Sequence, residues 1–213
     1  EDMIRFTTAT KNARKDSLIV SDLPINSYQT EEDAVANSLK LIQAGADAVK
    51  LEGGKEVAKI ITAITESGIH VMGHLGLLPQ TAEKYTVQGK TREDAIELIN
   101  DSKIITESGV FSIVLEMVTS QVAKIITEKI TVPTIGIGSG KDCDGQVLVV
   151  HDMLGLFEKI KPKFAKRYLS LSEEIRNAVK SYVTEVKEES FPGAGNEFQM
   201  DESEYNKLRK EIV

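Results

Sequence analysis

Short apolar segments alternate with helix-like segments along most of this sequence, and no other feature restricts the fold as strongly. The apolar segments are rich in β-branched residues and occur at residues 17–22, 48–51, 70–76, 111–116, 133–138 and 146–150. Strands that alternate with helices are typical of a parallel sheet covered by helices. We therefore predict an α/β protein with about six strands.

The length of the chain relates these strands to a barrel. An eight-stranded (β/α)8 TIM barrel usually takes about 250 residues, whereas this chain has 213. Residues 1–6 already have helical spacing, with no capping residue before them. We predict a TIM barrel whose first strand-helix units are missing from this chain. The alternative is an open doubly wound sheet, but no G-x-G-x-x-G motif lies between a strand and a helix.

The predicted helices have recognisable start and stop signals. Thr30 and Thr91 each precede an aspartate by three residues, which is typical of an N-terminal cap. Gly45 is expected to end the helix that begins after Thr30. Other helices are predicted at residues 1–15, 55–67, 120–129 and 161–186. We predict one barrel domain over residues 1–198 and a charged C-terminal extension, with a peripheral helix, over residues 199–213.

Composition excludes several classes of function. The formal net charge of -7 argues against a nucleic-acid-binding surface. Cys143 is the single cysteine, so no internal disulfide can form, and a reducing compartment is expected. No stretch has the length and apolarity of a membrane span, and no secretory leader is visible. These features predict a cytoplasmic protein.

Ionisable residues follow four consecutive predicted strands at the point where each strand ends. They are Asp22, Lys50 with Glu52, His74 and Glu116. Barrel enzymes build their active sites at the carboxyl ends of their strands. A structural ion pair between Lys50 and Glu52 is the simpler interpretation of that stretch taken alone. The repetition over four strands favours a functional site.

The residue types suggest particular roles. Asp22 and Glu52 are hard oxygen ligands that suit Mg²⁺, which takes one or two protein carboxylates and keeps waters. Lys50 could hold a substrate carboxylate or form a Schiff base, and the neighbouring Glu52 favours the first role. Glu116 lies among apolar residues in sequence and is a candidate general base, although a rim carboxylate is the alternative.

Other polar residues have weaker signals. His70 and His74 are four residues apart, but on a strand this spacing does not make a zinc site, so His70 is predicted to be structural. Residues 136–140 form a glycine-rich segment that could expose backbone N–H groups to an anion or simply permit a tight loop. Cys143 has no histidine beside it in sequence and is not predicted to be a nucleophile.

Several motifs together resemble the ketopantoate hydroxymethyltransferase family, also called 3-methyl-2-oxobutanoate hydroxymethyltransferases. The resemblance extends to about Phe198. It rests on Asp22–Pro24, Gly45–Gly54, Met72–Leu77, Val87–Thr91, Val114–Glu116, Ile135–Gly138, Asp144–Gln146, His151–Asp152, Pro162–Tyr168 and Phe191–Gly193.

This resemblance implies a (β/α)8 barrel, assembled into a homo-oligomer that is usually a decamer. It implies an enzyme that uses Mg²⁺ and 5,10-methylenetetrahydrofolate to hydroxymethylate 3-methyl-2-oxobutanoate. The product is 2-dehydropantoate, on the route to pantothenate and coenzyme A. By their positions in the motifs, Asp22 and Glu52 resemble the metal ligands, Glu116 the proton acceptor, and Asp22, Lys50 and His74 substrate-binding residues.

Two departures from the family pattern bear on the site. The family has a further Asp-Ser pair on an earlier strand, and the loop at residues 81–86 is shorter than the family's version. Two alternatives remain open: a Mg²⁺-dependent 2-oxo acid lyase of the phosphoenolpyruvate mutase and isocitrate lyase type, and an inactive barrel fragment that acts through subunit contacts. A cysteine-bearing lyase loop is not visible in the sequence.

Overall fold

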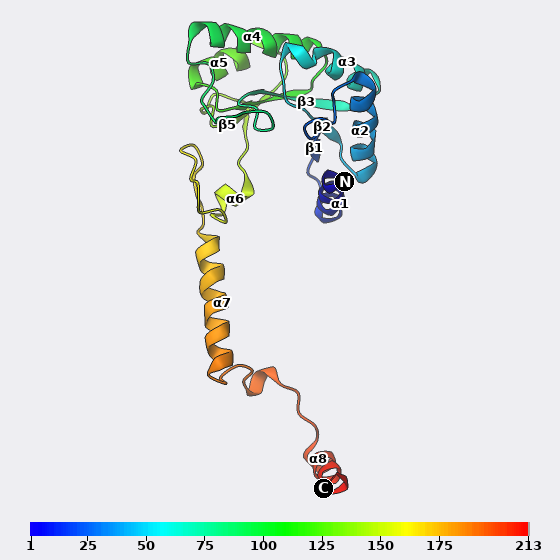
Figure 1. Ribbon diagram of the computed structural model, residues 1–213, viewed down its shortest axis with the longest axis vertical. Helices are drawn as coiled ribbons and strands as arrows, with labels where there is room; N and C mark the ends of the chain where they lie inside the picture. The colour runs from blue at the N-terminus through cyan, green and yellow to red at the C-terminus, as the bar shows by residue number, and fades with distance from the viewer. Residues whose placement is uncertain (213) are drawn as a thin grey trace. The chain divides into compact units, whose positions relative to one another are not determined.

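Six parallel strands form one sheet in the first part of the molecule (Figure 1). A computed structural model describes residues 1–212, and the chain divides into two compact units after Leu148. The strands lie in sequence order: β1 (Val20–Asp22), β2 (Ala48–Lys50), β3 (His70–Gly76), β4 (Ser112–Glu116), β5 (Thr134–Ile137) and β6 (Gly145–Gln146). A consecutive, all-parallel order is that of part of a (β/α) barrel. The predicted α/β class is confirmed.

Helix α1 (Asp2–Ala13) precedes β1, and helices connect the strands from β1 to β5. The connecting helices are α2 (Glu31–Ala44), the 3₁₀ helix η1 (Lys55–Val57) continuing into α3 (Ala58–Glu66), α4 (Arg92–Glu107) and α5 (Ser120–Lys129). The predicted caps are present, because Thr30 and Thr91 each accept a hydrogen bond at 3.1 Å from the backbone N–H three residues later. Gly45 ends α2 with a φ of 110°, a conformation that glycine adopts without strain.

The hydrophobic core lies between the sheet and the helices. Fully buried side chains from strands and helices pack together there, among them Leu51, Val71, Ile113 and Leu115 from the strand segments and Ile61, Ile64, Ile105 and Ile126 from the helices. Successive side chains of a strand point to opposite faces. Lys50, His74 and Glu116 therefore lie on the face opposite the core. The apolar side chains that pack against the helices determine which side chains point to that opposite face.

The last strand is shorter than the sequence predicts. The sequence predicts that a strand continues through residues 147–150, and this is wrong: β6 ends at Gln146, and Val150–Met153 form helix α6. β5 offers no further ladder partner, since the N–H of Val147 bonds Gly136 and no later residue pairs with β5. Apolar β-branched residues alone do not make a strand where no neighbouring strand continues.

The second unit, from Val149, contains α6, α7 (Leu171–Lys187), the 3₁₀ helix η2 (Ala194–Asn196) and α8 (Glu202–Glu211). Helix α7 begins ten residues after the start that the sequence predicts at residue 161, and Pro162 disfavours a helical conformation for the residue before it. The predicted peripheral helix of the extension is present as α8. That residues 1–198 form a single domain stays a prediction. In the part of the chain that the structure describes, no helix combines the length and the apolar character needed to cross a membrane.

Candidate active site

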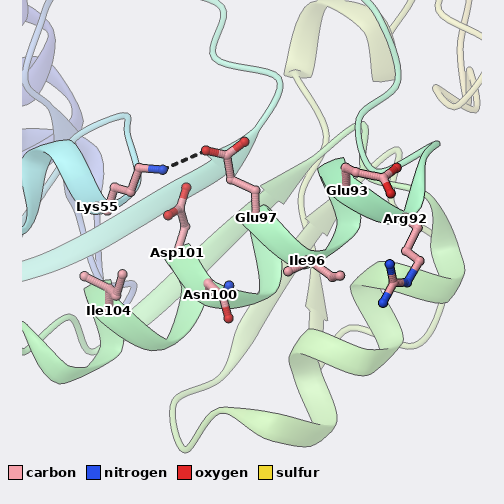
Figure 2. Close-up of a pocket in the computed structure, with 8 residues that line it drawn as sticks. All are labelled: Lys55, Arg92, Glu93, Ile96, Glu97, Asn100, Asp101 and Ile104. Carbon is pink, nitrogen blue, oxygen red and sulfur yellow. Dashed lines mark hydrogen bonds and ion pairs between the residues drawn. The ribbon is translucent and has the colours of Figure 1, made fainter.

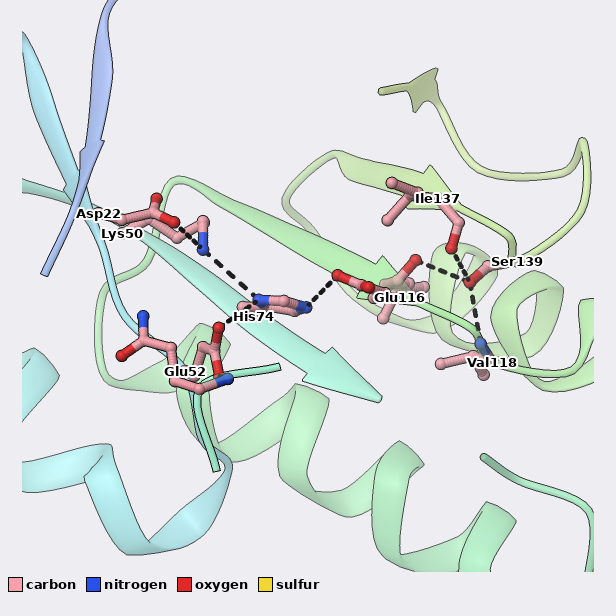
Figure 3. Close-up of polar contacts among 10 residues, drawn as sticks. Asp22, Lys50, Glu52, His74, Glu116, Val118, Ile137 and Ser139 are labelled. Carbon is pink, nitrogen blue, oxygen red and sulfur yellow. Dashed lines mark hydrogen bonds and ion pairs between the residues drawn. The ribbon is translucent and has the colours of Figure 1, made fainter. Parts of the chain in front are cut away.

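Five ionisable side chains predicted from the sequence gather at the carboxyl ends of β1 to β4 (Figure 3). The register explains why they meet: Asp22 is paired with Lys50 across β1 and β2, and Gly76 is paired with Glu116 across β3 and β4. His74 lies two residues before Gly76 and so lies between the two groups. The face of the sheet away from the core thus carries a continuous row of charged and polar groups.

Lys50 lies between an acid and an imidazole. Its Nζ is 2.9 Å from Oδ2 of Asp22 and 3.5 Å from Nδ1 of His74. The lysine side chain is mostly buried, whereas that of Asp22 is partly exposed. No ion pair forms between Lys50 and Glu52 in the described chain, so the simple structural pair considered from the sequence is not what this stretch builds.

His74 is buried between two carboxylates. Its Nδ1 is 3.7 Å from Oε1 of Glu52, and its Nε2 is 3.4 Å from Oε2 of Glu116. The second contact is long for a hydrogen bond, and Nε2 has no hydrogen-bond partner among the described residues. Lysine is only a donor, so the contact with Lys50 favours the tautomer that has its proton on Nε2, facing Glu116.

Glu52 is buried and is held by groups that the sequence did not single out. Its Oε2 accepts a hydrogen bond from the backbone N–H of Gln80 at 3.1 Å. The hydroxyl of Tyr28 donates to the backbone carbonyl of Glu52 at 3.4 Å. Burial raises the pKa of Tyr28, and the nearby carboxylates of Glu52 and Asp22 raise it further, so this hydroxyl keeps its proton and serves as a donor.

The end of β4 is shaped by a buried serine. The Oγ of Ser139 donates to the carbonyl of Leu115 at 2.7 Å and accepts from the N–H of Val118 at 3.0 Å. These contacts lie on both sides of Glu116 in the chain. Met117 between them has a φ of 50°, an uncommon conformation for a residue other than glycine. The hydrogen bonds of Ser139 thus fix the turn that directs Glu116.

A close backbone approach explains Gly76 at the exit of β3. The N–H of Leu77 bonds the carbonyl of Glu116 at 2.8 Å. A Cβ on Gly76 would lie 2.2 Å from that same carbonyl oxygen, and the residue has a φ of 97°. Only glycine fits both requirements, so the loop after β3 can pass directly over the catalytic candidate Glu116.

The carboxylates suit Mg²⁺ better than zinc. The described residues contain no group of three or more His, Cys, Asp or Glu side chains arranged to hold a metal ion. Mg²⁺ needs only one or two protein carboxylates, with water and substrate oxygens completing its shell. Asp22 and Glu52, at the ends of the neighbouring strands β1 and β2, offer carboxylate oxygens of this kind.

The weaker sequence signals are accounted for by local structure. His70 is exposed at the amino end of β3 and packs edge to face with Phe111, with ring centroids 6.3 Å apart, away from the carboxyl ends of the strands. In the glycine-rich segment, Ser139 is buried and occupied by its own backbone contacts. Cys143 is buried, and burial raises the pKa of its thiol, which disfavours the nucleophilic thiolate.

A separate concavity of about 470 Å³ lies against α4 and η1 (Figure 2). It contains none of the predicted site residues. One ion pair lies in it, since Nζ of Lys55 contacts Oε1 of Glu97 at 2.8 Å. Burial raises the pKa of Asp101 beside them. We interpret this concavity as a surface groove between side chains of α4 and η1.

The fold and the site define a barrel-type α/β enzyme whose ionisable side chains gather at the carboxyl ends of parallel strands. Residues 1–194 match the ketopantoate hydroxymethyltransferase family. The chain belongs to this family, and it is a transferase of the hydroxymethyltransferase type.

Known relatives support this assignment. The chain is 55% identical to the 3-methyl-2-oxobutanoate hydroxymethyltransferase of Nitrosopumilus maritimus (strain SCM1), over 100% of this chain and 77% of the relative. It is 49% identical to the enzyme of that name from Clostridium botulinum (strain Alaska E43 / Type E3), over 98% and 78%. A crystal structure of phosphonopyruvate hydrolase shares the fold, with a TM-score of 0.52 and 10% identity over 98% of this chain and 74% of that one.

Proposed function

We propose that this protein transfers a hydroxymethyl group from 5,10-methylenetetrahydrofolate to 3-methyl-2-oxobutanoate. The observation that carries the proposal is the position of Glu116 at 3.4 Å from buried His74, beside Lys50, Asp22 and Glu52, in a chain of this family. In the net reaction, C3 of the keto acid loses a proton and gains the one-carbon unit. One water supplies the hydroxyl oxygen, and tetrahydrofolate and 2-dehydropantoate are released.

Asp22 and Glu52 are the residues proposed to hold Mg²⁺. Both provide hard carboxylate oxygens, and Asp22 is exposed enough to exchange its contact with Lys50. Glu52 is held by the N–H of Gln80, which leaves its other oxygen facing the site. Bound Mg²⁺ would supply positive charge at the keto and carboxylate oxygens of the substrate, which favours the enolate.

Lys50 and His74 are proposed to bind the keto acid. Lys50 presents a mostly buried ammonium group, and a charge-assisted hydrogen bond to a carboxylate is strong where water is scarce. His74 with its proton on Nε2 faces Glu116 and can keep that carboxylate oriented. Both side chains are fixed by strand register rather than by loops, which preserves their geometry.

Glu116 is proposed to remove the C3 proton. It lies at the end of β4, only partly exposed, and its backbone is anchored by Leu77 and by the hydrogen bonds of Ser139. A carboxylate placed in this way acts as a general base, a role that typically contributes about 10² to 10⁴ in rate. The resulting enolate carbon then forms the new bond to the one-carbon unit.

The protein is further proposed to act in the cytoplasm as a homo-oligomer, and a decamer is the arrangement implied by the family resemblance. α7 supports association, because it has a stripe of exposed apolar side chains: Ile175, Val179, Tyr182, Val183 and Val186. Contiguous exposed apolar surface commonly marks a contact with another protein.

Solvent exchange at C3 of 3-methyl-2-oxobutanoate tests the central step without the folate. In D₂O with Mg²⁺, the wild-type protein is expected to exchange the C3 proton, as followed by NMR. Glu116→Gln is expected to slow exchange by roughly 100-fold or more, because the amide cannot accept the proton. The control is Glu107→Gln on the exposed end of α4, which should exchange at the wild-type rate.

The outcomes separate the alternatives. Normal exchange in Glu116→Gln would assign the base to another residue. A wild-type protein that binds neither Mg²⁺ nor the keto acid would instead be an inactive barrel. Formation of 2-dehydropantoate, once 5,10-methylenetetrahydrofolate is added, identifies the transferase and excludes a lyase.

A further inference from the structure

Gln80 connects two strand ends that carry the proposed metal ligands. Its backbone N–H donates to Oε2 of Glu52 at 3.1 Å, and its side-chain Nε2 donates to the carbonyl of Leu23 at 3.1 Å. Leu23 directly follows Asp22 and is fully buried. A single loop residue is therefore bonded to the ends of both β1 and β2.

The orientation of the Gln80 amide follows from its partner. The carbonyl of Leu23 can only accept a hydrogen bond, so the amide nitrogen must face it. Oε1 then points the other way, and it is buried with no hydrogen-bond partner among the described residues. A buried acceptor without a partner is costly. The side chain thus makes its contact with Leu23 at the cost of one unpaired acceptor.

The loop around Gln80 is built to present its N–H. The N–H groups of Thr81 and Ala82 bond the carbonyl of Leu78 at 3.1 and 3.0 Å, which closes a turn. Upstream, Leu77 is bonded to Glu116. Between these backbone contacts, the side chain of Gln80 holds the turn to the end of β1. Without this side chain, the backbone N–H that donates to Glu52 would no longer be held in place.

We propose that Gln80 is a positioning residue for Glu52. It holds one oxygen of that carboxylate and directs the other into the site, and its amide ties the loop to the residue after Asp22. Partners that orient a ligating carboxylate commonly affect metal affinity by about 10- to 100-fold when removed. This inference rests on the proposed function, in which Glu52 binds Mg²⁺.

Two measurements on Gln80→Ala test the proposal. Calorimetric titration with Mg²⁺ alone is expected to give a dissociation constant about tenfold higher than that of the wild type. Hydrogen-deuterium exchange of residues 77–82 is expected to be faster than in the wild type, because the turn loses its tether to Leu23. Gln80→Glu should behave in the same way, since a carboxylate cannot donate to that carbonyl.

Gln88→Ala is the matched control. Gln88 lies in the same loop, but its side chain bonds only Thr86, in an exposed position. It should leave Mg²⁺ affinity and the exchange of residues 77–82 unchanged. Wild-type values for both measurements in Gln80→Ala would overturn the proposal, and a wild-type affinity for Mg²⁺ in Gln80→Glu would show that the amide donor has no role.

Failure of the proposed function gives a different pattern. A wild-type protein that neither binds Mg²⁺ nor exchanges the C3 proton removes the metal role of Glu52. The hydrogen-deuterium exchange of residues 77–82 then tests the positioning role by itself. Faster exchange in Gln80→Ala supports the proposal that Gln80 holds this loop against Glu52, and unchanged exchange overturns that proposal.

Discussion

Lys50 shows how one side chain can serve both the fold and the proposed chemistry. Its ammonium group contacts Asp22 and His74, and it is mostly buried. A buried charge must be compensated, and here a partly exposed carboxylate provides the compensation. Because Asp22 also reaches solvent, it can remain hydrated when Lys50 turns toward a substrate carboxylate.

We therefore expect Lys50→Met to raise the KM for 3-methyl-2-oxobutanoate by roughly 10- to 100-fold, the loss typical of a hydrogen bond to a charged group. Methionine retains an apolar stem of similar length, so the packing is preserved. Steady-state kinetics of 2-dehydropantoate formation measures the change. Lys55→Met is the control, since Lys55 pairs with Glu97 on the outer side of α4; an equal change in both variants would contradict a specific role.

At the residue scale, ionisable groups at strand ends were predictable and their supports were not. Asp22, Lys50 and Glu116 are the last residues of their strands, and parallel strands bring their carboxyl ends to the same edge of the sheet. Gln80 contacts Glu52 through its backbone N–H, and Tyr28 contacts Glu52 through its hydroxyl. Both residues are more than twenty positions from Glu52 in the sequence. Such contacts have no local pattern, and only the folded chain shows them.

At the scale of elements, Asp47 joins the entrance of the sheet to the first helix. Its Oδ2 accepts a hydrogen bond from the N–H of Ile19 at 2.8 Å and pairs with the guanidinium of Arg14. Ile19 directly precedes β1, and Arg14 directly follows α1. The Ile19 N–H, followed by the Arg14 guanidinium, holds the pKa of Asp47 below its ordinary value of 3.8.

This lowered pKa predicts a pH-dependent contribution to stability. A carboxylate favoured in the folded state contributes fully above the unfolded-state pKa, and the contribution is lost as pH falls through the lower folded-state pKa. Asp47→Asn should therefore reduce the free energy of unfolding near about pH 7, and the difference from wild type should narrow near about pH 3.

Urea denaturation at both pH values measures the difference. Asp16→Asn is the control, because Asp16 is exposed and makes no side-chain hydrogen bond or ion pair with the described residues. If the difference in unfolding free energy between Asp47→Asn and wild type were the same at the lower pH, the contribution of Asp47 to stability would come from its shape rather than its charge.

Elements with local signals were predicted well. α2 and α4 begin at their capping threonines, and α5 matches its predicted range because its apolar spacing is regular. The sequence predicts too long a β6, because the length of this strand depends on its pairing with β5. The sequence of residues 146–150 does not encode that pairing. Strand length is a property of pairs.

At the scale of the whole molecule, the parallel sheet is predictable because the same alternation of an apolar strand with a helix recurs along the chain. The C-terminal unit has no such repetition. Its helix α7 has an apolar stripe, whereas α8 has none of comparable extent, and every described residue from Gln199 to Ile212 is exposed. The two helices are thus expected to contribute differently to the assembled protein.

Removal of residues 199–213 tests this difference. The side-chain contacts of α8 are local, such as Ser203 with Asp201 and Lys207 with Glu204, and exposed pairs of this kind contribute little. We expect the truncated protein to keep its transferase activity, its oligomeric mass and its Tm to within about 2 °C. Light scattering after gel filtration, thermal unfolding and the product assay measure these quantities. A smaller number of chains per oligomer would instead identify α8 as a contact between copies, because a segment with only local contacts cannot otherwise hold an oligomer together.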